Sequence, residues 1–121
     1  MSRALITLIA TIALGGGTAL ALADSTPVGP LPAGPAATIG VQHGELIALA
    51  LPERSGGRVW RVARRFDANV LGQVAEANVG SSVVLVFRAK NAGSTTVTLA
   101  LTKSDASAKA LESRRFQVRV H

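Results

Sequence analysis

The chain has 121 residues, a formal net charge of +6 at pH 7 and no cysteine. This length predicts a single domain. The absence of cysteine excludes thiol nucleophiles, disulfides and cysteine-ligated metal sites, so an exported domain of this sequence has to fold by packing alone.

The first 23 residues have the layout of a secretory signal peptide. A short basic start precedes an apolar run over residues 4–14, which is followed by three glycines and the small-x-small sequence Ala21-Leu22-Ala23. The apolar run is short for a membrane span, and an uncleaved N-terminal anchor is the alternative. We expect cleavage after Ala23 and a secreted protein of the bacterial periplasm, with no stable membrane anchor after cleavage.

Residues 24–37 contain four prolines and two glycines and carry almost no charge. A stretch of this composition is extended, so we interpret it as a linker between the cleavage site and the domain. The alternative is a ligand for a proline-recognising groove.

From residue 38 onward, apolar and polar residues alternate in short runs separated by turn residues. We expect strands at residues 39–41, 46–51, 60–63, 70–77, 83–88, 95–101 and 114–120. Such runs, with turn chemistry about every ten residues, are typical of a sandwich. The predicted fold of residues 38–121 is therefore all-β, an immunoglobulin-like antiparallel β-sandwich of about seven strands. Residues 105–112 are the one helix candidate, with a loop as the alternative.

The only tryptophan, Trp60, begins the third expected strand directly after a loop that holds a proline and two glycines. Immunoglobulin-like folds often bury a tryptophan near the start of a central strand. We predict that Trp60 packs on Leu49, Phe87, Leu99 and Val118.

The residues that would carry catalysis are few. His43 and His121 are the only histidines, and the seven carboxylates are scattered without a close pair. No spacing resembles a metal site, and no serine-elbow signature is present, although a Ser–His–Asp arrangement built on His43 is the alternative. We expect no enzyme, no catalytic residues, no cofactor and no metal.

Five arginines fall within twelve residues of the middle of the chain: Arg54, Arg58, Arg61, Arg64 and Arg65. Such a cluster could meet nucleic acid or another anionic surface. Single-stranded nucleic-acid sites normally add stacking aromatics, whereas this chain has one Trp and three Phe. Together with the expected export, this argues against nucleic acid and favours a solvated basic face.

Five segments of the domain carry a family pattern, at residues 51–60, 79–81, 87–93, 97–99 and 113–118. They resemble the chagasin-family inhibitors of papain-like cysteine proteases, and the resemblance covers residues 39–120. It implies an immunoglobulin-like sandwich whose three loops at one end plug the protease cleft without being cleaved. It also implies a papain-like cysteine protease as the partner and reversible inhibition as the activity of a monomer.

The first of these loops matches the family best. Gly57 and Trp60 stand at the family's Gly and Trp, and Ser55 replaces a Thr, while other loop positions differ. The resemblance implies protease-binding residues in all three loops: Ser55, Gly56, Gly57 and Arg58 in the first, Gly80 and Ser81 in the second, and Lys103 in the third. The alternative function is a non-inhibitory immunoglobulin-like periplasmic binding module that uses its basic surface.

Overall fold

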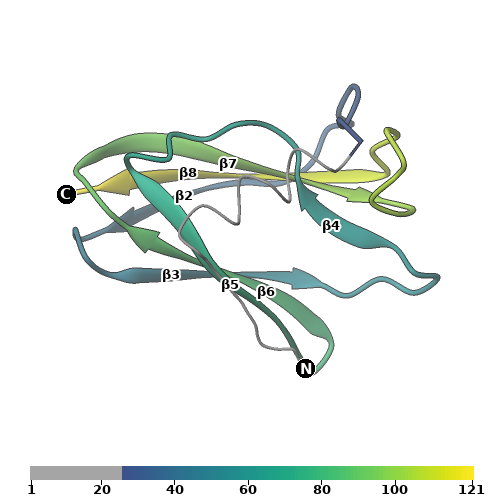
Figure 1. The fold of residues 1–121 in the computed structure, drawn as a ribbon, viewed down its shortest axis with the longest axis horizontal. Coiled ribbons are helices and arrows are strands. Elements are labelled where there is room, and N and C mark those ends of the chain that lie inside the picture. Colours follow the sequence, from purple (N-terminus) through teal and green to yellow (C-terminus); the bar gives the residue numbers. More distant parts are fainter. Residues whose placement is uncertain (1–25) are drawn as a thin grey trace.

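The computed structural model describes residues 26–121, so the predicted signal peptide lies outside the described residues. Seven strands and no helix make up the fold of this part of the chain (Figure 1). The strands are β2 (Ala36–Val41), β3 (Leu46–Pro52), β4 (Val59–Val62), β5 (Leu71–Val79), β6 (Ser82–Ala89), β7 (Gly93–Thr102) and β8 (Glu112–Val120). Each lies at a position where the alternation predicts a strand, and the predicted all-β class is confirmed.

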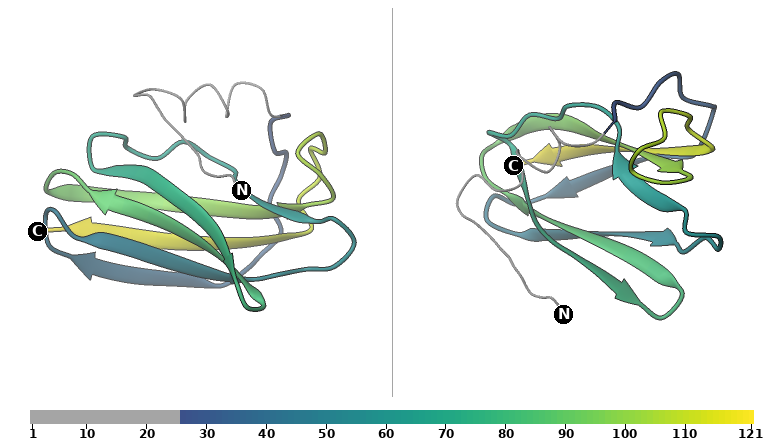
Figure 2. Two further views of the ribbon diagram at one scale, coloured as in Figure 1. Left: turned by 60° about the horizontal axis from the view of Figure 1, so that its bottom comes forward. Right: turned by 45° about the vertical axis from the view of Figure 1, so that its right-hand side comes forward.

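The strands form two sheets that face each other as an immunoglobulin-like sandwich (Figure 2). One sheet has the order β2-β8-β7-β4 and the other the order β3-β6-β5. All pairings are antiparallel except that of the first and last strands, β2 and β8, which run parallel. This parallel pair brings the two ends of the domain side by side. Parallel strands cannot be joined by a hairpin, and here the other five strands lie between them in the sequence.

The core comes from the inward-facing half of each alternating strand. In β3, Ile47, Leu49 and Leu51 are buried and pair across the ladder with Phe87, Leu85 and Val83 of β6. The intervening residues of β3 up to Ala50 are exposed, because successive side chains of a strand point to opposite faces.

Strand β5 departs from the simple alternation. Its register with β6 shifts between Gln73 and Ala75, where Val74 is an extra residue and is 52% exposed. A β-bulge of this kind moves all later side chains of the strand to the opposite phase. Strand β5 therefore has no regular alternation of buried and exposed residues along its length.

Trp60 is 6% exposed and belongs to the same buried cluster as Leu49, Phe87, Leu99 and Val118, in agreement with the predicted core. The sequence did not predict the role of Phe66, in the segment between β4 and β5. Its ring meets that of Phe87 edge-on, with centroids 5.6 Å apart. Such aromatic pairs contribute beyond their buried area.

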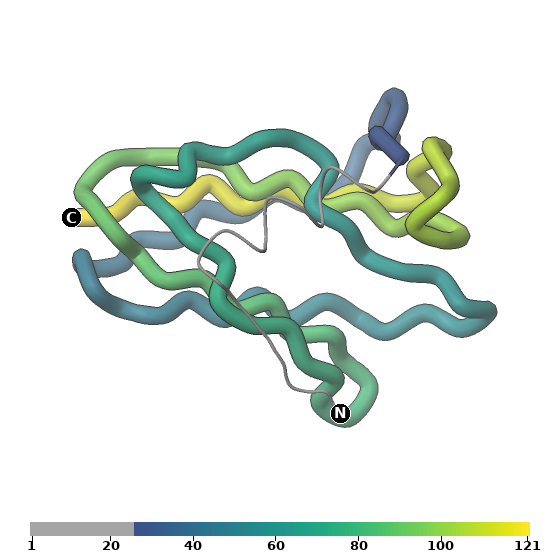
Figure 3. The backbone as a smooth tube through the Cα atoms, in the orientation of Figure 1, coloured from purple at the N-terminus to yellow at the C-terminus, as the bar shows by residue number. Residues whose placement is uncertain are grey.

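Three loops lie at one end of the sandwich (Figures 2 and 3). The first loop (residues 53–58) joins β3 to β4, the second (residues 80 and 81) joins β5 to β6, and the third (residues 103–111) joins β7 to β8. The first loop lies between the other two. The helix candidate, residues 105–112, has no helical structure: residues 105–111 belong to the third loop, and Glu112 begins β8. Within residues 26–121, no helix is long and apolar enough to cross a membrane.

Candidate functional site

The first loop crosses from one sheet to the other, and its base is closed by hydrogen bonds to two backbone carbonyls. The indole Nε1 of Trp60 donates a hydrogen bond to the carbonyl oxygen of Pro52 at 2.9 Å, which joins the two ends of the loop. The amide of Glu53 donates to the carbonyl oxygen of Ser81 at 2.9 Å, which joins the first loop to the second. The buried tryptophan therefore sets both the core packing and the shape of the loop.

The tip of the first loop is Ser55, Gly56, Gly57 and Arg58, and all four residues are exposed. Gly56 and Gly57 have φ angles of 80° and 74°, in the left-handed region that favours glycine. A Cβ atom built on either glycine would meet no heavy atom within 4 Å. The tip is thus a narrow strip of backbone that projects into open space.

Arg54, at the side of the same loop, forms a bidentate pair with Glu112 at the start of β8. Its Nε and Nη2 donate to the two carboxylate oxygens at 2.9 Å each. These hydrogen bonds lower the pKa of Glu112, and the charges of Arg54, Arg114 and Arg58 lower it further. Partial desolvation of the carboxylate raises the pKa and so opposes part of this effect. The same hydrogen bonds raise the pKa of Arg54. The first loop is in this way attached to the root of the third.

Arg114, two residues after Glu112 in β8, contacts Trp60. Its guanidinium carbon is 5.6 Å from the centroid of the Trp60 ring, within the range of a cation–π interaction. Its Nε is buried without a hydrogen-bond partner among the described residues. The tryptophan that closes the first loop is therefore also covered by a residue of β8.

The second loop is the two-residue turn of the β5–β6 hairpin, between the paired residues Val79 and Ser82. Gly80 has a φ of 60°, and a Cβ atom there would meet open space. Gly80 and Ser81 are both exposed. This turn is shorter than the first loop and is fixed to it through Ser81.

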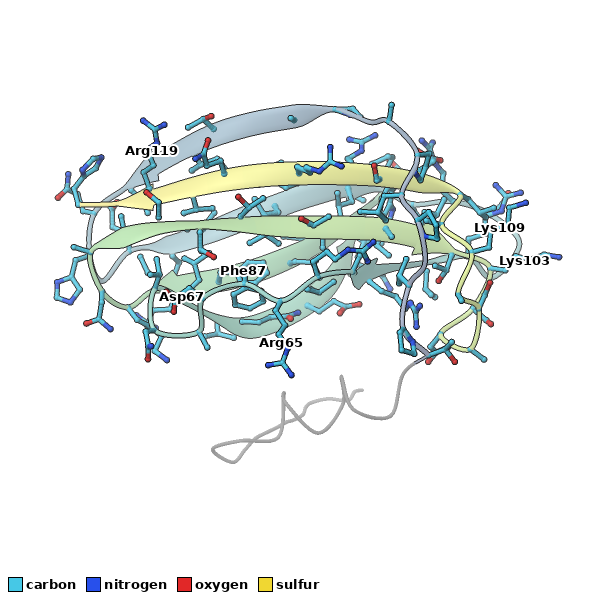
Figure 4. The ribbon with its side chains drawn as sticks, turned by 90° about the horizontal axis from the view of Figure 1, so that it is seen from above. Arg65, Asp67, Phe87, Lys103, Lys109 and Arg119 are labelled. Carbon is cyan, nitrogen blue, oxygen red and sulfur yellow. The ribbon has the colours of Figure 1, made fainter. Side chains whose placement is uncertain are left out.

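The third loop is longer, and both of its ends are hydrogen-bonded to the last residues of β7. Thr102 Oγ1 donates to the carbonyl oxygen of Ser104 at 2.8 Å, and the amide of Leu111 donates to that of Leu101 at 2.7 Å. Lys103 and Lys109 project at this end of the molecule (Figure 4). The seven predicted site residues are thus all exposed, on three loops at one end of the sandwich.

The arginine cluster is largely engaged within the protein. Arg54 is paired with Glu112, and the guanidinium groups of Arg61 and Arg64 donate to backbone carbonyls. Among the described residues, no hydrogen bond is recorded for Arg58 or Arg65, and Arg65 points away from the body (Figure 4). The sequence predicted a solvated basic face: Arg58, Arg64 and Arg65 are exposed, whereas the half-buried Arg54 and Arg61 are hydrogen-bonded to Glu112 and to the third loop. The sequence carries no signal for these contacts, because their acceptors, the Glu112 carboxylate and the backbone carbonyls of residues 28, 29, 105 and 107, lie far away along the chain.

The histidines lie away from the three loops. The amide of His43, in the turn between β2 and β3, donates to the carbonyl oxygen of His121 at 2.9 Å, so both are at the opposite end of the sandwich. Within residues 26–121, no group of three or more His, Cys, Asp or Glu could hold a metal ion.

No family model matches the sequence, and no curated protein matches it. The fold is similar to that of the cysteine protease inhibitor EhICP2 from Entamoeba histolytica, with a TM-score of 0.58 and 15% identity over 72% of this chain and 97% of that one. The solution structure of amebosin has a TM-score of 0.49 and 18% identity over 74% of this chain and 100% of that one. The likeness to EhICP2 shows that this chain has a chagasin-like fold, as the sequence resemblance implied.

Proposed function

We propose that this chain is a reversible inhibitor of a papain-like cysteine protease and that the tip of the first loop enters the active-site cleft. The observation that carries the proposal is the Gly56-Gly57 tip, which has left-handed backbone and no neighbour within 4 Å of either built Cβ position. EhICP2, whose fold this chain shares, is a cysteine protease inhibitor. In this role the chain acts as a binding protein without chemistry of its own.

The base of the first loop supports this role energetically. Fixing the backbone of one residue costs about 1–2 kcal/mol, so a flexible loop would lose much of its binding free energy on being ordered. Here the contacts of Trp60, Glu53 and Arg54 order the loop before any partner arrives. A rigid strip of backbone without Cβ atoms fits a narrow cleft and offers its amide and carbonyl groups for hydrogen bonds.

The remaining predicted residues surround this wedge of Ser55, Gly56 and Gly57. In the proposal, Arg58, Gly80, Ser81 and Lys103 contact the rim of the cleft from the three loops. The charge of Arg54 is compensated by Glu112, whereas no carboxylate partner is recorded for Arg58 or Lys103 among the described residues. Burying an unpaired charge is costly, so these two side chains favour a target whose cleft has an acidic rim. In the proposal the protein is exported, is cleaved after Ala23 and binds its target one to one as a monomer.

A pair of matched glycine variants tests the wedge. Gly57→Trp places a bulky side chain on the tip, and Gly44→Trp places the same side chain on the turn at the opposite end. Gly44 has a φ of 93° and the same open surroundings, so both variants carry comparable backbone strain. We expect Gly57→Trp to abolish competitive inhibition of papain and Gly44→Trp to retain it. Equal inhibition by the two variants would contradict the wedge.

A further inference from the structure

The third loop is hydrogen-bonded to Arg61 of the edge strand β4. Arg61 Nη1 donates to the carbonyl oxygen of Asp105 at 2.6 Å, and Nη2 donates to that of Ser107 at 2.9 Å. Hydrogen bonds from a charged donor are stronger than neutral ones. Both Nη atoms of Arg61 thus donate to this loop, whereas its Nε is buried without a hydrogen-bond partner in the described part of the chain.

The segment 26–35, within the stretch expected to be a linker, holds the same loop from the side. The amide of Thr26 donates to the carbonyl oxygen of Asp105 at 3.3 Å, and the amide of Gly29 donates to that of Ala108 at 2.7 Å. The segment and the third loop lie side by side in Figures 1 and 3. Asp105 therefore accepts hydrogen bonds from both the segment and Arg61.

The segment is itself attached to the domain along its length. Four further hydrogen bonds are accepted by its carbonyl oxygens: those of Val28 and Gly29 from Arg64 at 3.0 and 2.9 Å, that of Pro32 from Ser113 Oγ at 2.6 Å, and that of Pro35 from the Arg115 amide at 3.0 Å. At Gly34 a Cβ atom would lie 2.0 Å from the carbonyl oxygen of Ser113, so this close contact requires glycine. Prolines in the segment suit a path that accepts hydrogen bonds and donates few.

We propose that residues 26–35 together with Arg61 and Arg64 form a brace that positions the third loop for the protease. The inference rests on the proposed function, in which the third loop contacts the rim of the cleft. The loop spans nine residues without a strand or helix, and its recorded internal contacts are short-range turns. External hydrogen bonds order it in advance and so reduce the entropy lost on binding. Arg61 is thus a positioning residue that need not touch the partner.

The main test compares Arg61→Gln with Arg65→Gln in the full chain. Both substitutions remove one positive charge from the same segment, but only Arg61 is hydrogen-bonded to the third loop. Hydrogen–deuterium exchange of residues 103–111 reports the order of the loop, and the inhibition constant against papain reports binding. For Arg61→Gln we expect faster exchange and an inhibition constant raised about tenfold or more, since bonds from a charged donor are lost. Arg65→Gln should match the parent in both measurements.

A second pair tests the segment without changing charge. Gly29→Pro removes the amide that donates to Ala108, whereas Gly29→Ala keeps it and adds a Cβ atom 3.3 Å from the same oxygen. We expect the proline variant to reproduce the faster exchange and weaker inhibition of Arg61→Gln, and the alanine variant to stay closer to the parent. Thermal unfolding identifies any variant that has lost its fold.

Each outcome decides a different part of the inference. Unchanged exchange in both Arg61→Gln and Gly29→Pro would show that no brace exists. Faster exchange with an unchanged inhibition constant would show that the brace does not serve protease binding. If the parent does not inhibit papain, the proposed function and the role of the brace in it fall together, while the exchange data still decide whether the third loop is braced.

Discussion

Arg54 in the first loop and Glu112 at the start of β8 are 58 positions apart in the sequence and are joined by two hydrogen bonds of 2.9 Å. This ion pair connects the first loop, which carries the glycine tip, to the end of the third loop. The indole hydrogen bond of Trp60 closes the first loop from below. The first loop is therefore bonded to the root of the third through Glu112, and to the second through the hydrogen bond from the Glu53 amide to the Ser81 carbonyl.

The Arg54–Glu112 pair predicts a dependence of stability on pH. The folded-state pKa of Glu112 is lowered below its unfolded value of about 4.3, so the pair stabilises the protein above that pH and the contribution is lost as the pH falls through the folded pKa. The effect should be small, because both side chains are 36% exposed. Urea unfolding followed by Trp60 fluorescence should show the parent more stable than Glu112→Gln at pH 7. The difference should disappear toward pH 3, and a constant difference would contradict the assignment.

Two substitutions of Trp60 distinguish its contribution to core packing from its hydrogen bond across the base of the first loop. Trp60→Ala removes a large side chain that is 6% exposed, and it should lower the free energy of unfolding by roughly 3–5 kcal/mol. Trp60→Phe keeps most of the packing but loses the hydrogen bond to Pro52, at a cost of about 1 kcal/mol for that bond. Chemical denaturation followed by far-UV circular dichroism measures both. Parent-like stability of Trp60→Ala would show that the core assignment is wrong.

The left-handed backbone at Gly57 predicts a graded response to substitution. A non-glycine residue in this region costs about 1–2 kcal/mol, and asparagine tolerates it better than a β-branched residue. Gly57→Val should therefore be less stable than Gly57→Asn, although a Cβ atom there meets open space. The midpoints of thermal unfolding measure this order. The reverse order would mean that the loop does not keep its φ of 74°.

Arg58 is exposed and forms no ion pair within residues 26–121, which predicts a modest salt dependence of inhibition. An exposed ion pair contributes roughly 0.2–1 kcal/mol and is screened by salt, so the inhibition constant should rise only about two- to fivefold between 50 and 500 mM sodium chloride. Arg58→Gln should reduce this dependence, and Arg65→Gln should leave it unchanged. A much steeper dependence that is shared by both arginines would favour a binding module that uses its basic surface.

The positions of the strands could be predicted because alternation reports directly on which side of a strand is buried. Ile47, Leu49 and Leu51 alternate with exposed residues, and the structure buries all three. The bulge at Val74 could not be predicted in the same way, because one extra residue reverses the phase and leaves no regular pattern. Nor does the alternation indicate that β2 pairs in parallel with β8.

The candidate site could be predicted only at the tips of its loops. Glycines at positions 56, 57 and 80 signal turns, and all three have a positive φ. The support beneath the tips was not predictable, since Arg54, Arg61 and Arg64 look alike in the sequence and differ only in what they reach. Likewise, the composition of residues 26–35 predicts an extended path but not the carbonyls and amides to which that path is bonded.

The most direct test of the proposed inhibitor is a titration of papain with the chain from Asp24 to His121, following turnover of a small peptide substrate. If the first loop enters the cleft, inhibition is reversible, is competitive with substrate and saturates at one chain per protease. Noncompetitive inhibition, or undiminished turnover at high concentrations of the folded chain, would contradict inhibition of papain through insertion of the first loop into the cleft.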